Sequence, residues 1–127
     1  MISLFKPYMP ELPDINKILH SGMLAYGNYT KEFEKILKKY FNTEYLIVTN
    51  SFNVAISIAL ATLGISYGDE VIASPMACLA STQPYLANGI NIKWADVDPL
   101  RGTLLPESVK TQITAKTKAI IHNHYCG

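Results

Sequence analysis

The sequence lacks a charge excess and has few cysteines. It carries 11 Lys and Arg against 10 Asp and Glu, which gives a formal net charge of +1. This balance would not hold a nucleic-acid backbone or an anionic membrane surface without a specific pocket, so neither is expected as a partner. The two cysteines, Cys78 and Cys126, lie far apart and have no CxxC spacing. They are typical of reduced thiols in a cytosolic protein rather than of a disulfide scaffold.

Long apolar runs and targeting signals are missing as well. No apolar stretch approaches the ~18 residues that a membrane span needs. The N-terminus has prolines at positions 7, 10 and 13 and no sustained apolar core, which argues against a signal or transit peptide. With 49% hydrophobic and 17% charged residues among 127, the composition is typical of one soluble globular domain, and we expect a cytoplasmic protein.

The N-terminal region is predicted to be helical. A short helix around residues 15–19 should end near Gly22, and Thr30 should cap a second helix. Apolar side chains of the second helix recur at i, i+3, i+4, i+7 and i+8, at Phe33, Ile36, Leu37, Tyr40 and Phe41. Lysines lie mostly on the opposite side and alternate with Glu32 and Glu34, which favours a solvated face over an anion-binding patch. We therefore expect an amphipathic helix that packs on a core.

The rest of the chain alternates between short apolar runs and helical segments. The apolar runs, each rich in strand-forming residues, are Tyr45–Val48, Glu70–Ala73, Ile90–Ala95 and Ala119–Ile121. Helices are predicted at residues 51–63, 77–87 and 106–114, with Pro84 as a kink in the second. Strands that are apolar on both faces and alternate with helices form parallel sheets covered on both sides. The predicted fold class is α/β, with a mostly parallel sheet and alternating β-α units.

The strand-to-helix junction Thr49–Asn53, called the joint below, is the main candidate site. In open parallel sheets, ligands bind beyond the carboxyl ends of the strands, where helix N-termini present unpaired N–H groups and the positive end of the dipole. The main-chain amides of Phe52 and Asn53, with Val54 as a further candidate, could bind a phosphate there, aided by the hydroxyl of Ser51 or the amide of Asn53. Serine and asparagine are also the preferred caps of a helix that binds nothing, so both interpretations stay open. The joint has neither a G-x-G-x-x-G nor a G-x-x-x-x-G-K-[ST] motif, which argues against a dinucleotide or triphosphate site.

Two other side-chain groups are weaker candidates. His122, His124 and Cys126 alternate, so in an extended chain they share a face and could bind a soft divalent metal, although no fourth ligand is evident. Asp96 and Asp98 also alternate and could pair as acid and base. A turn at Asp98 and the following proline is the favoured interpretation.

Cys78 is the third weaker candidate. It lies near a predicted helix N-terminus, where a thiol could act as a nucleophile. No partner base is evident in the sequence around it. A small residue within the core is the favoured interpretation.

Several segments, in this order and spacing, resemble the N-terminal part of the nucleotide-sugar aminotransferases of the DegT/StrS type. The segments are Ser21-Gly22 and Gly27 ahead of Phe33-Glu34, the joint, Gly64-Ile65 leading to Gly68-Asp69-Glu70-Val71-Ile72, Asp96-Val97-Asp98, Thr117-Lys118-Ala119-Ile120-Ile121, and His124 with Gly127. These enzymes depend on pyridoxal 5'-phosphate and have the aspartate-aminotransferase fold. The resemblance implies that residues 1–127 are part of the large domain of a fold-type I enzyme, with N-terminal helices in 1–43 and the β-α portion in 44–127, truncated after the fourth strand.

The resemblance also implies a cofactor site. Main-chain amides at Phe52 and Asn53 would bind the cofactor phosphate. The family commonly has Ser-Gly-Thr at the joint, and Phe52 in place of glycine changes how closely the backbone can approach a phosphate. Cys78 occupies the position where the family usually places an aromatic ring against the pyridine. A thiol cannot stack as a ring does, but it can pack there as a small polarizable group.

Two groups that transamination needs have no counterpart in the sequence. The reaction requires a Schiff-base lysine and an acid on the pyridine nitrogen, and in this family both lie beyond the equivalent of Gly127. The lysines present are interpreted as solvated surface charges. The chain as given is therefore expected to be catalytically incomplete, with no catalytic residue and no metal ligand assigned, and to bind pyridoxal 5'-phosphate weakly or not at all.

The family's reaction sets the expected partners. Its members move an amino group from an amino acid, often glutamate, to a keto group on a nucleotide-linked sugar, and they work as homodimers. Which sugar and donor are used, and whether the product serves a polysaccharide or a secondary metabolite, stays open. The alternative is a non-enzymatic domain of similar fold that binds a phosphorylated small molecule or another protein.

Overall fold

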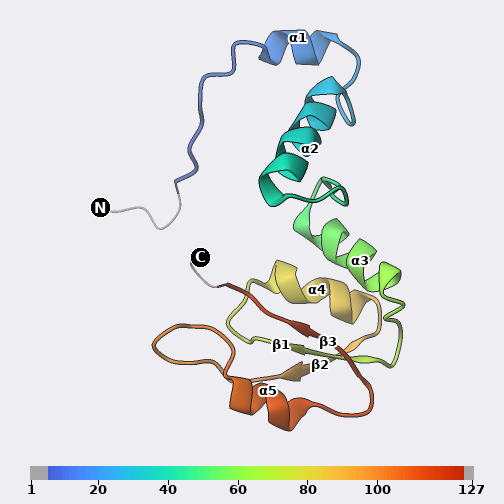
Figure 1. The fold of residues 1–127 in the computed structure, drawn as a ribbon, viewed down its shortest axis with the longest axis vertical. Coiled ribbons are helices and arrows are strands. Elements are labelled where there is room, and N and C mark those ends of the chain that lie inside the picture. The colour runs from blue at the N-terminus through green and yellow to red at the C-terminus, as the bar shows by residue number, and fades with distance from the viewer. Residues whose placement is uncertain (1–5, 125–127) are drawn as a thin grey trace. The chain divides into compact units, whose positions relative to one another are not determined.

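The computed structural model describes residues 6–124 and divides the chain into two compact units, Met1–Val48 and Thr49–Gly127. The first unit contains the helices α1 (Ile15–His20) and α2 (Asn28–Phe41), labelled in Figure 1. α2 begins two residues before the predicted cap at Thr30, so that prediction is wrong. The helix begins earlier because Gly27, which is extended and buried, is its N-cap. The Gly27 carbonyl accepts the first helical hydrogen bond, from the Lys31 N–H at 3.2 Å.

The apolar stripe of α2 is present but is not covered. Phe33, Ile36, Tyr40 and Phe41 are all more than half exposed, although they have the spacing of a core-facing stripe. Within residues 6–48, the only other helix is the six-residue α1, which is too small to bury such a stripe. The expectation that α2 packs on a core is therefore not met in the described part of this unit.

The predicted strand Tyr45–Val48 is not formed. In the part of the chain that the structure describes, this segment pairs with no strand, and Tyr45 and Ile47 are 96% and 66% exposed. Its backbone uses side chains instead: the Tyr45 N–H donates to Thr43 Oγ1 at 3.1 Å, and the Val48 N–H donates to Glu34 Oε1 at 3.1 Å. A segment with strand propensity needs a neighbouring strand to pair with its backbone, and residues 6–44 form none.

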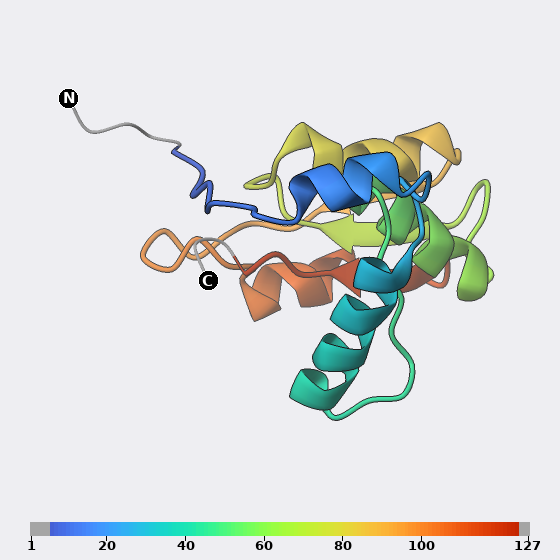
Figure 2. The same ribbon diagram turned by 90° about the horizontal axis from the view of Figure 1, so that it is seen from above.

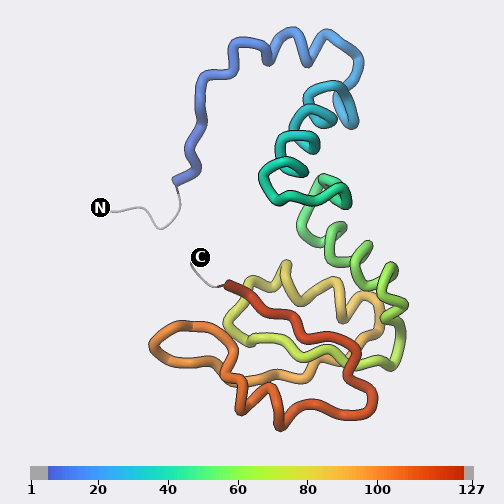
Figure 3. The backbone as a smooth tube through the Cα atoms, in the orientation of Figure 1, coloured from blue at the N-terminus to red at the C-terminus, as the bar shows by residue number. Residues whose placement is uncertain are grey.

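The second unit is an α/β layer structure, as the sequence predicts. Its elements in chain order are α3 (Phe52–Thr62), β1 (Glu70–Ala73), α4 (Leu79–Ala87), β2 (Asn91–Trp94), α5 (Pro106–Gln112) and β3 (Thr117–Ile121). The described strands form one parallel sheet in the order β2-β1-β3, and Figure 3 shows the chain crossing between them. Pro84 lies inside α4, where the sequence places it.

The sheet has a helix layer on each face. The chain moves from β1 to β2 in one direction and from β2 past β1 to β3 in the other, so right-handed crossovers put α4 and α5 on opposite faces. Figures 1 and 2 show this arrangement. Val71 and Ile72 are both fully buried and point to different faces, because side chains alternate along a strand.

Two apolar clusters fill the space between the sheet and its helices. The cluster under α3 and α4 consists of Leu60, Ile65, Val71, Tyr85 and Ile90. The cluster under α5 consists of Ile72, Ala95 and Leu104, with Val109 packed against it. None of the described helices combines the length and the hydrophobicity that crossing a bilayer requires.

Candidate functional site

The joint forms the capped N-terminus of α3. Ser51 is the N-cap, with an extended backbone (φ −159°, ψ 157°), and its Oγ accepts from the Val54 N–H at 3.3 Å. Thr49 Oγ1 donates to the Ser51 carbonyl at 2.8 Å, and the same carbonyl accepts from the Ala55 N–H at 3.2 Å. The side chains of the joint therefore fix its own backbone. The predicted role of the Val54 amide is wrong, because the Ser51 cap already uses that donor.

Two amides in the first turn of α3 have no acceptor among the described residues. The N–H groups of Phe52 and Asn53 donate to no acceptor within residues 6–124. They lie in the first turn of an 11-residue helix, where the helix dipole is positive. The segment Thr49–Asn53 contains no acidic side chain. This arrangement suits a small anion such as a phosphate, and the donors are the two that the sequence predicts.

An open groove runs beside the joint between α3 and α4. Its lining residues are Asn53, Val54 and Ser57 from α3, and Gln83, Pro84 and Ala87 from α4. Asn53 thus contributes both an amide at the helix end and a half-buried side chain in the groove. Sequence reasoning missed the polar residues Ser57 and Gln83. The available signal for Ser57 was its position one helical turn after Asn53.

Cys78 lies at the N-terminus of the next helix. It is the N-cap of α4, with an extended backbone, and it is exposed, so the interpretation as a small core residue is wrong. The loop that carries it leaves β1 through buried Ser74, whose Oγ accepts from the Met76 N–H at 3.1 Å. The cysteine begins the helix outside the packed layers, so no core surrounds it. Cys78 does not line the groove beside Asn53, and its place against a cofactor ring stays a prediction.

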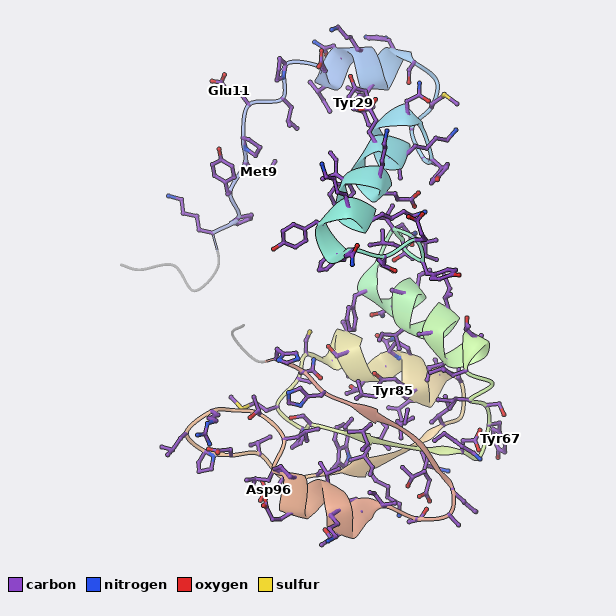
Figure 4. The ribbon with its side chains drawn as sticks, viewed as in Figure 1. Met9, Glu11, Tyr29, Tyr67, Tyr85 and Asp96 are labelled. Atoms are coloured by element: carbon purple, nitrogen blue, oxygen red, sulfur yellow. The ribbon has the colours of Figure 1, made fainter. Side chains whose placement is uncertain are left out.

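The favoured turn at Asp98 is confirmed. Asp98 Oδ1 accepts from the Leu100 N–H at 2.8 Å and from the Arg101 N–H at 3.1 Å, and its Oδ2 accepts from Arg101 Nη1 at 3.0 Å. The Leu100 bond first, and the Arg101 bonds and charge after it, hold the pKa of the Asp98 carboxyl below its usual range. Asp96 makes different contacts: its N–H donates to Ser108 Oγ at 2.8 Å, which ties the loop to α5 (Figure 4). The two carboxylates are not hydrogen-bonded to each other.

The histidine cluster has two described members. The rings of His122 and His124 meet edge to face, with centroids 4.7 Å apart and planes at 86°. Cys126 lies outside the described residues. Among residues 6–124, no group of three or more His, Cys, Asp and Glu side chains is arranged to hold a metal ion.

A polar cluster that the sequence did not predict lies in the first unit. The carboxylate of Glu34 accepts from the Val48 N–H and, at 2.8 Å, from the Tyr26 hydroxyl. The bond from Val48, followed by the bond from Tyr26, lowers the pKa of Glu34. The bond to Glu34 in turn raises the pKa of Tyr26. The Glu34 carboxylate therefore stays ionised to a lower pH than usual and accepts hydrogen bonds from both donors.

The fold and the joint define a class of protein: an α/β protein with a parallel sheet and a helix end whose first amides have no acceptor among residues 6–124. The model of the DegT/DnrJ/EryC1/StrS aminotransferase family matches residues 9–127. The chain belongs to this family, which confirms the resemblance drawn from its segments.

Curated relatives have names that fit this family. The chain is 29% identical over 117 residues to the spore coat polysaccharide biosynthesis protein SpsC of Bacillus subtilis (strain 168), covering 92% of this chain and 30% of the relative. It is 34% identical over 116 residues to the 3-oxo-glucose-6-phosphate:glutamate aminotransferase of the same organism, covering 91% of this chain and 26% of the relative. The chain therefore spans less than a third of each relative.

A solved structure shares the fold. The crystal structure of NtdA from Bacillus subtilis with bound cofactor PMP matches with a TM-score of 0.80 and 33% identity, covering 85% of this chain and 25% of that one. This similarity confirms the predicted fold class, the N-terminal part of a fold-type I aminotransferase. It also supports pyridoxal phosphate chemistry as a property of the family.

Proposed function

We propose that this chain is part of the large domain of a pyridoxal-phosphate-dependent aminotransferase that acts on a nucleotide-linked keto sugar. In this proposal, the joint binds the cofactor phosphate. The observation that carries it is that the amides of Phe52 and Asn53, in the first turn of α3, have no acceptor among residues 6–124 in a chain of this family. A cytoplasmic homodimer is part of the same proposal.

The residues of the joint fit an anionic group. Phe52 and Asn53 offer two main-chain donors, and the hydroxyl proton of Ser51 is a third, because its oxygen lone pair already accepts from Val54. The bonds from Thr49 and to Val54 hold this backbone in place before any ligand arrives, which lowers the entropy lost on binding. Bound pyridoxal phosphate supplies an electron sink and carries the amino group.

Other parts of the site are assigned by position. In this proposal Cys78, exposed at the start of α4, packs against the cofactor ring as a small polarizable group. Ser57 and Gln83 line the groove beside Asn53 and present a hydroxyl and an amide there. These contacts orient a ligand and do not move a proton.

The chain as given is proposed to lack the groups that carry the chemistry. Lys17 pairs with Asp14 at 2.7 Å and Lys93 approaches Glu70 at 3.9 Å, so both have structural partners. The four lysines of α2 lie in the first unit, whose described residues form no strand. We assign none of these lysines to a Schiff base, and we assign no acid to the pyridine nitrogen.

The test is a titration of the purified chain with pyridoxal 5'-phosphate, followed by absorbance and then by borohydride reduction. The expected result is reversible binding that depends on the phosphate, with pyridoxal as the ligand that lacks it, and no reduced adduct. Binding of both ligands with equal affinity would refute the role of the joint. A stable adduct on one lysine would refute the claim of catalytic incompleteness. Phosphate-dependent binding that inorganic phosphate competes for equally well would instead favour a phosphate-binding domain that does not select the cofactor.

A further inference from the structure

The helix layer formed by α3 and α4 carries no charge. The segments 45–68 and 71–92, which contain both helices and the loops around them, have no Asp, Glu, Lys or Arg, although 17% of the whole chain is charged. The helix on the other face of the sheet, α5, contains Glu107 and Lys110. The sheet of the second unit is therefore covered by a charged helix on one face and by an uncharged pair of helices on the other.

The outward side of α3 is apolar as well as the side that faces the sheet. Ile56 and Leu60 pack in the cluster beneath the helix, whereas Val54 and Ile58 are exposed. Val54, Ser57 and Ile58 have the i, i+3, i+4 spacing of residues that share one face of a helix. A helix that is apolar all round is typical of one that is covered on every side.

α4 has the same pattern. Tyr85 is buried in the cluster beneath it, whereas Leu79 and Leu86 are 71% and 61% exposed. Leu79, Gln83 and Leu86 follow one another at i, i+4 and i+7 and so share a face. The outward stripes of the two helices meet at the groove between them and together form what we call the neutral face, which consists of Val54, Ser57, Ile58, Leu79, Gln83 and Leu86.

The chemistry of the neutral face suits a protein partner, and in particular its own copy. Contiguous exposed apolar surface marks interaction sites, and the core of a protein interface is depleted in charged residues. In a symmetric dimer, a residue near the two-fold axis meets the same residue of the second copy, so a charge there would face a like charge. A face without charge avoids that repulsion. We propose that the neutral face binds the neutral face of a second copy of this chain.

This inference rests on the proposed function, because it names the surface through which the proposed homodimer forms. The groove at the centre of the neutral face is also lined by Asn53, whose amide is one of the two proposed phosphate donors. The second copy would therefore border the joint.

The test is sedimentation equilibrium of the full 127-residue chain over a range of concentrations. Gln83→Glu adds a charge to the neutral face with almost no change in shape, and Gln112→Glu, at the end of α5, is its matched control. Leu86→Lys adds a charge at an exposed apolar position, and Ile113→Lys, directly after α5 and also exposed, is the second control. Circular dichroism checks that each variant is folded.

The parent chain is expected to dimerise. Gln83→Glu and Leu86→Lys should each raise the Kd of the dimer about 10- to 100-fold, because they place two like charges in one interface. Gln112→Glu and Ile113→Lys should leave that Kd unchanged. An equimolar mixture of Gln83→Glu and Gln83→Lys should dimerise more tightly than either variant alone, because opposite charges then face each other.

Three results would refute the inference: a monomeric parent chain, controls that raise the Kd as much as the variants of the neutral face do, or a mixture that associates no better than its components. The last result would show that the neutral face meets a different surface. The proposed cofactor site is judged separately by the pyridoxal 5'-phosphate titration. A monomer that binds this ligand through its phosphate would remove only the inference, and a dimer that binds it no better than pyridoxal would remove only the cofactor site.

Discussion

The substitution Phe52→Pro tests whether the main-chain N–H of Phe52 donates to the phosphate of a bound ligand. Proline has no N–H, so the variant removes one of the two N–H groups in the first turn of α3 that have no acceptor among residues 6–124. The structure allows the change: Phe52 is the first residue of α3, the helical position where proline is best tolerated. Ser51 is extended (φ −159°, ψ 157°), the conformation that a residue before proline prefers. The helix is therefore expected to stay intact.

The size of the effect follows from the lost hydrogen bond. A bond to a charged group contributes about 1.5–3 kcal/mol. Phe52 is 53% exposed, so water competes at this site and the lower end of the range applies. A loss of about 1.5 kcal/mol corresponds to a Kd about tenfold higher for pyridoxal 5'-phosphate.

The assay is a calorimetric or absorbance titration with pyridoxal 5'-phosphate and, separately, with pyridoxal. Phe52→Ala is the matched control, because it removes the ring and keeps the N–H. Only Phe52→Pro is expected to bind pyridoxal 5'-phosphate more weakly than the parent chain. The circular dichroism spectrum should be unchanged in both variants. If Phe52→Pro binds pyridoxal 5'-phosphate as tightly as Phe52→Ala does, the amide is not a phosphate donor and the reasoning about the joint is wrong.

Three further predictions concern stability. The hydroxyl of Tyr85, a residue labelled beside α4 in Figure 4, is buried and has no hydrogen-bond partner within residues 6–124. Tyr85→Phe should therefore leave the free energy of unfolding, measured by urea denaturation, unchanged or raise it by up to about 1 kcal/mol. A clear loss of stability would show that the hydroxyl has a partner. The folded-state pKa of Asp98 is lowered, so its carboxylate contributes stability above the unfolded pKa of about 3.9, and that contribution is lost as the pH falls through the folded value. Unfolding followed from pH 6 downward should show this loss in the parent chain, and an equal loss in Asp98→Asn would contradict it. Gly89 and Gly64 both have φ +67°, so Gly89→Ala and Gly64→Ala should each cost about 1 kcal/mol in unfolding free energy. The added Cβ at Gly89 would clash with the ring of Tyr67. Because this ring is exposed and can turn aside, a much larger loss in Gly89→Ala would show that the ring is fixed.

The periodicity of the sequence was sufficient to predict most of the second unit. Apolar runs around Val71, Ile92 and Ile120 form the three described parallel strands. The central strand β1 shows the reason most clearly, because Val71 and Ile72 are buried on opposite faces and both positions must therefore be apolar. The turn at Asp98 was predictable for a local reason: the aspartate accepts from amides two and three residues ahead. Local chemistry also placed the cap at Ser51.

Long-range partners were not predictable from the same patterns. Tyr45–Val48 has the composition of a strand but pairs with none of the described strands, since strand formation depends on a neighbour that composition does not specify. Cys78 was expected in the core but caps an exposed helix end, because burial depends on which elements lie above a residue. The groove that brings Ser57 and Gln83 together needs the packing of α3 on α4.

The sequence by itself determined the family, the alternation of strands and helices, and the two amides at Phe52 and Asn53 that have no acceptor among residues 6–124, because these depend on side-chain type and near neighbours along the chain. The tertiary structure alone decided which distant groups meet, as at Glu34 and Val48. Hydrogen bonds form over about 3 Å in space, and residues 14 positions apart come within that distance only after the chain has folded.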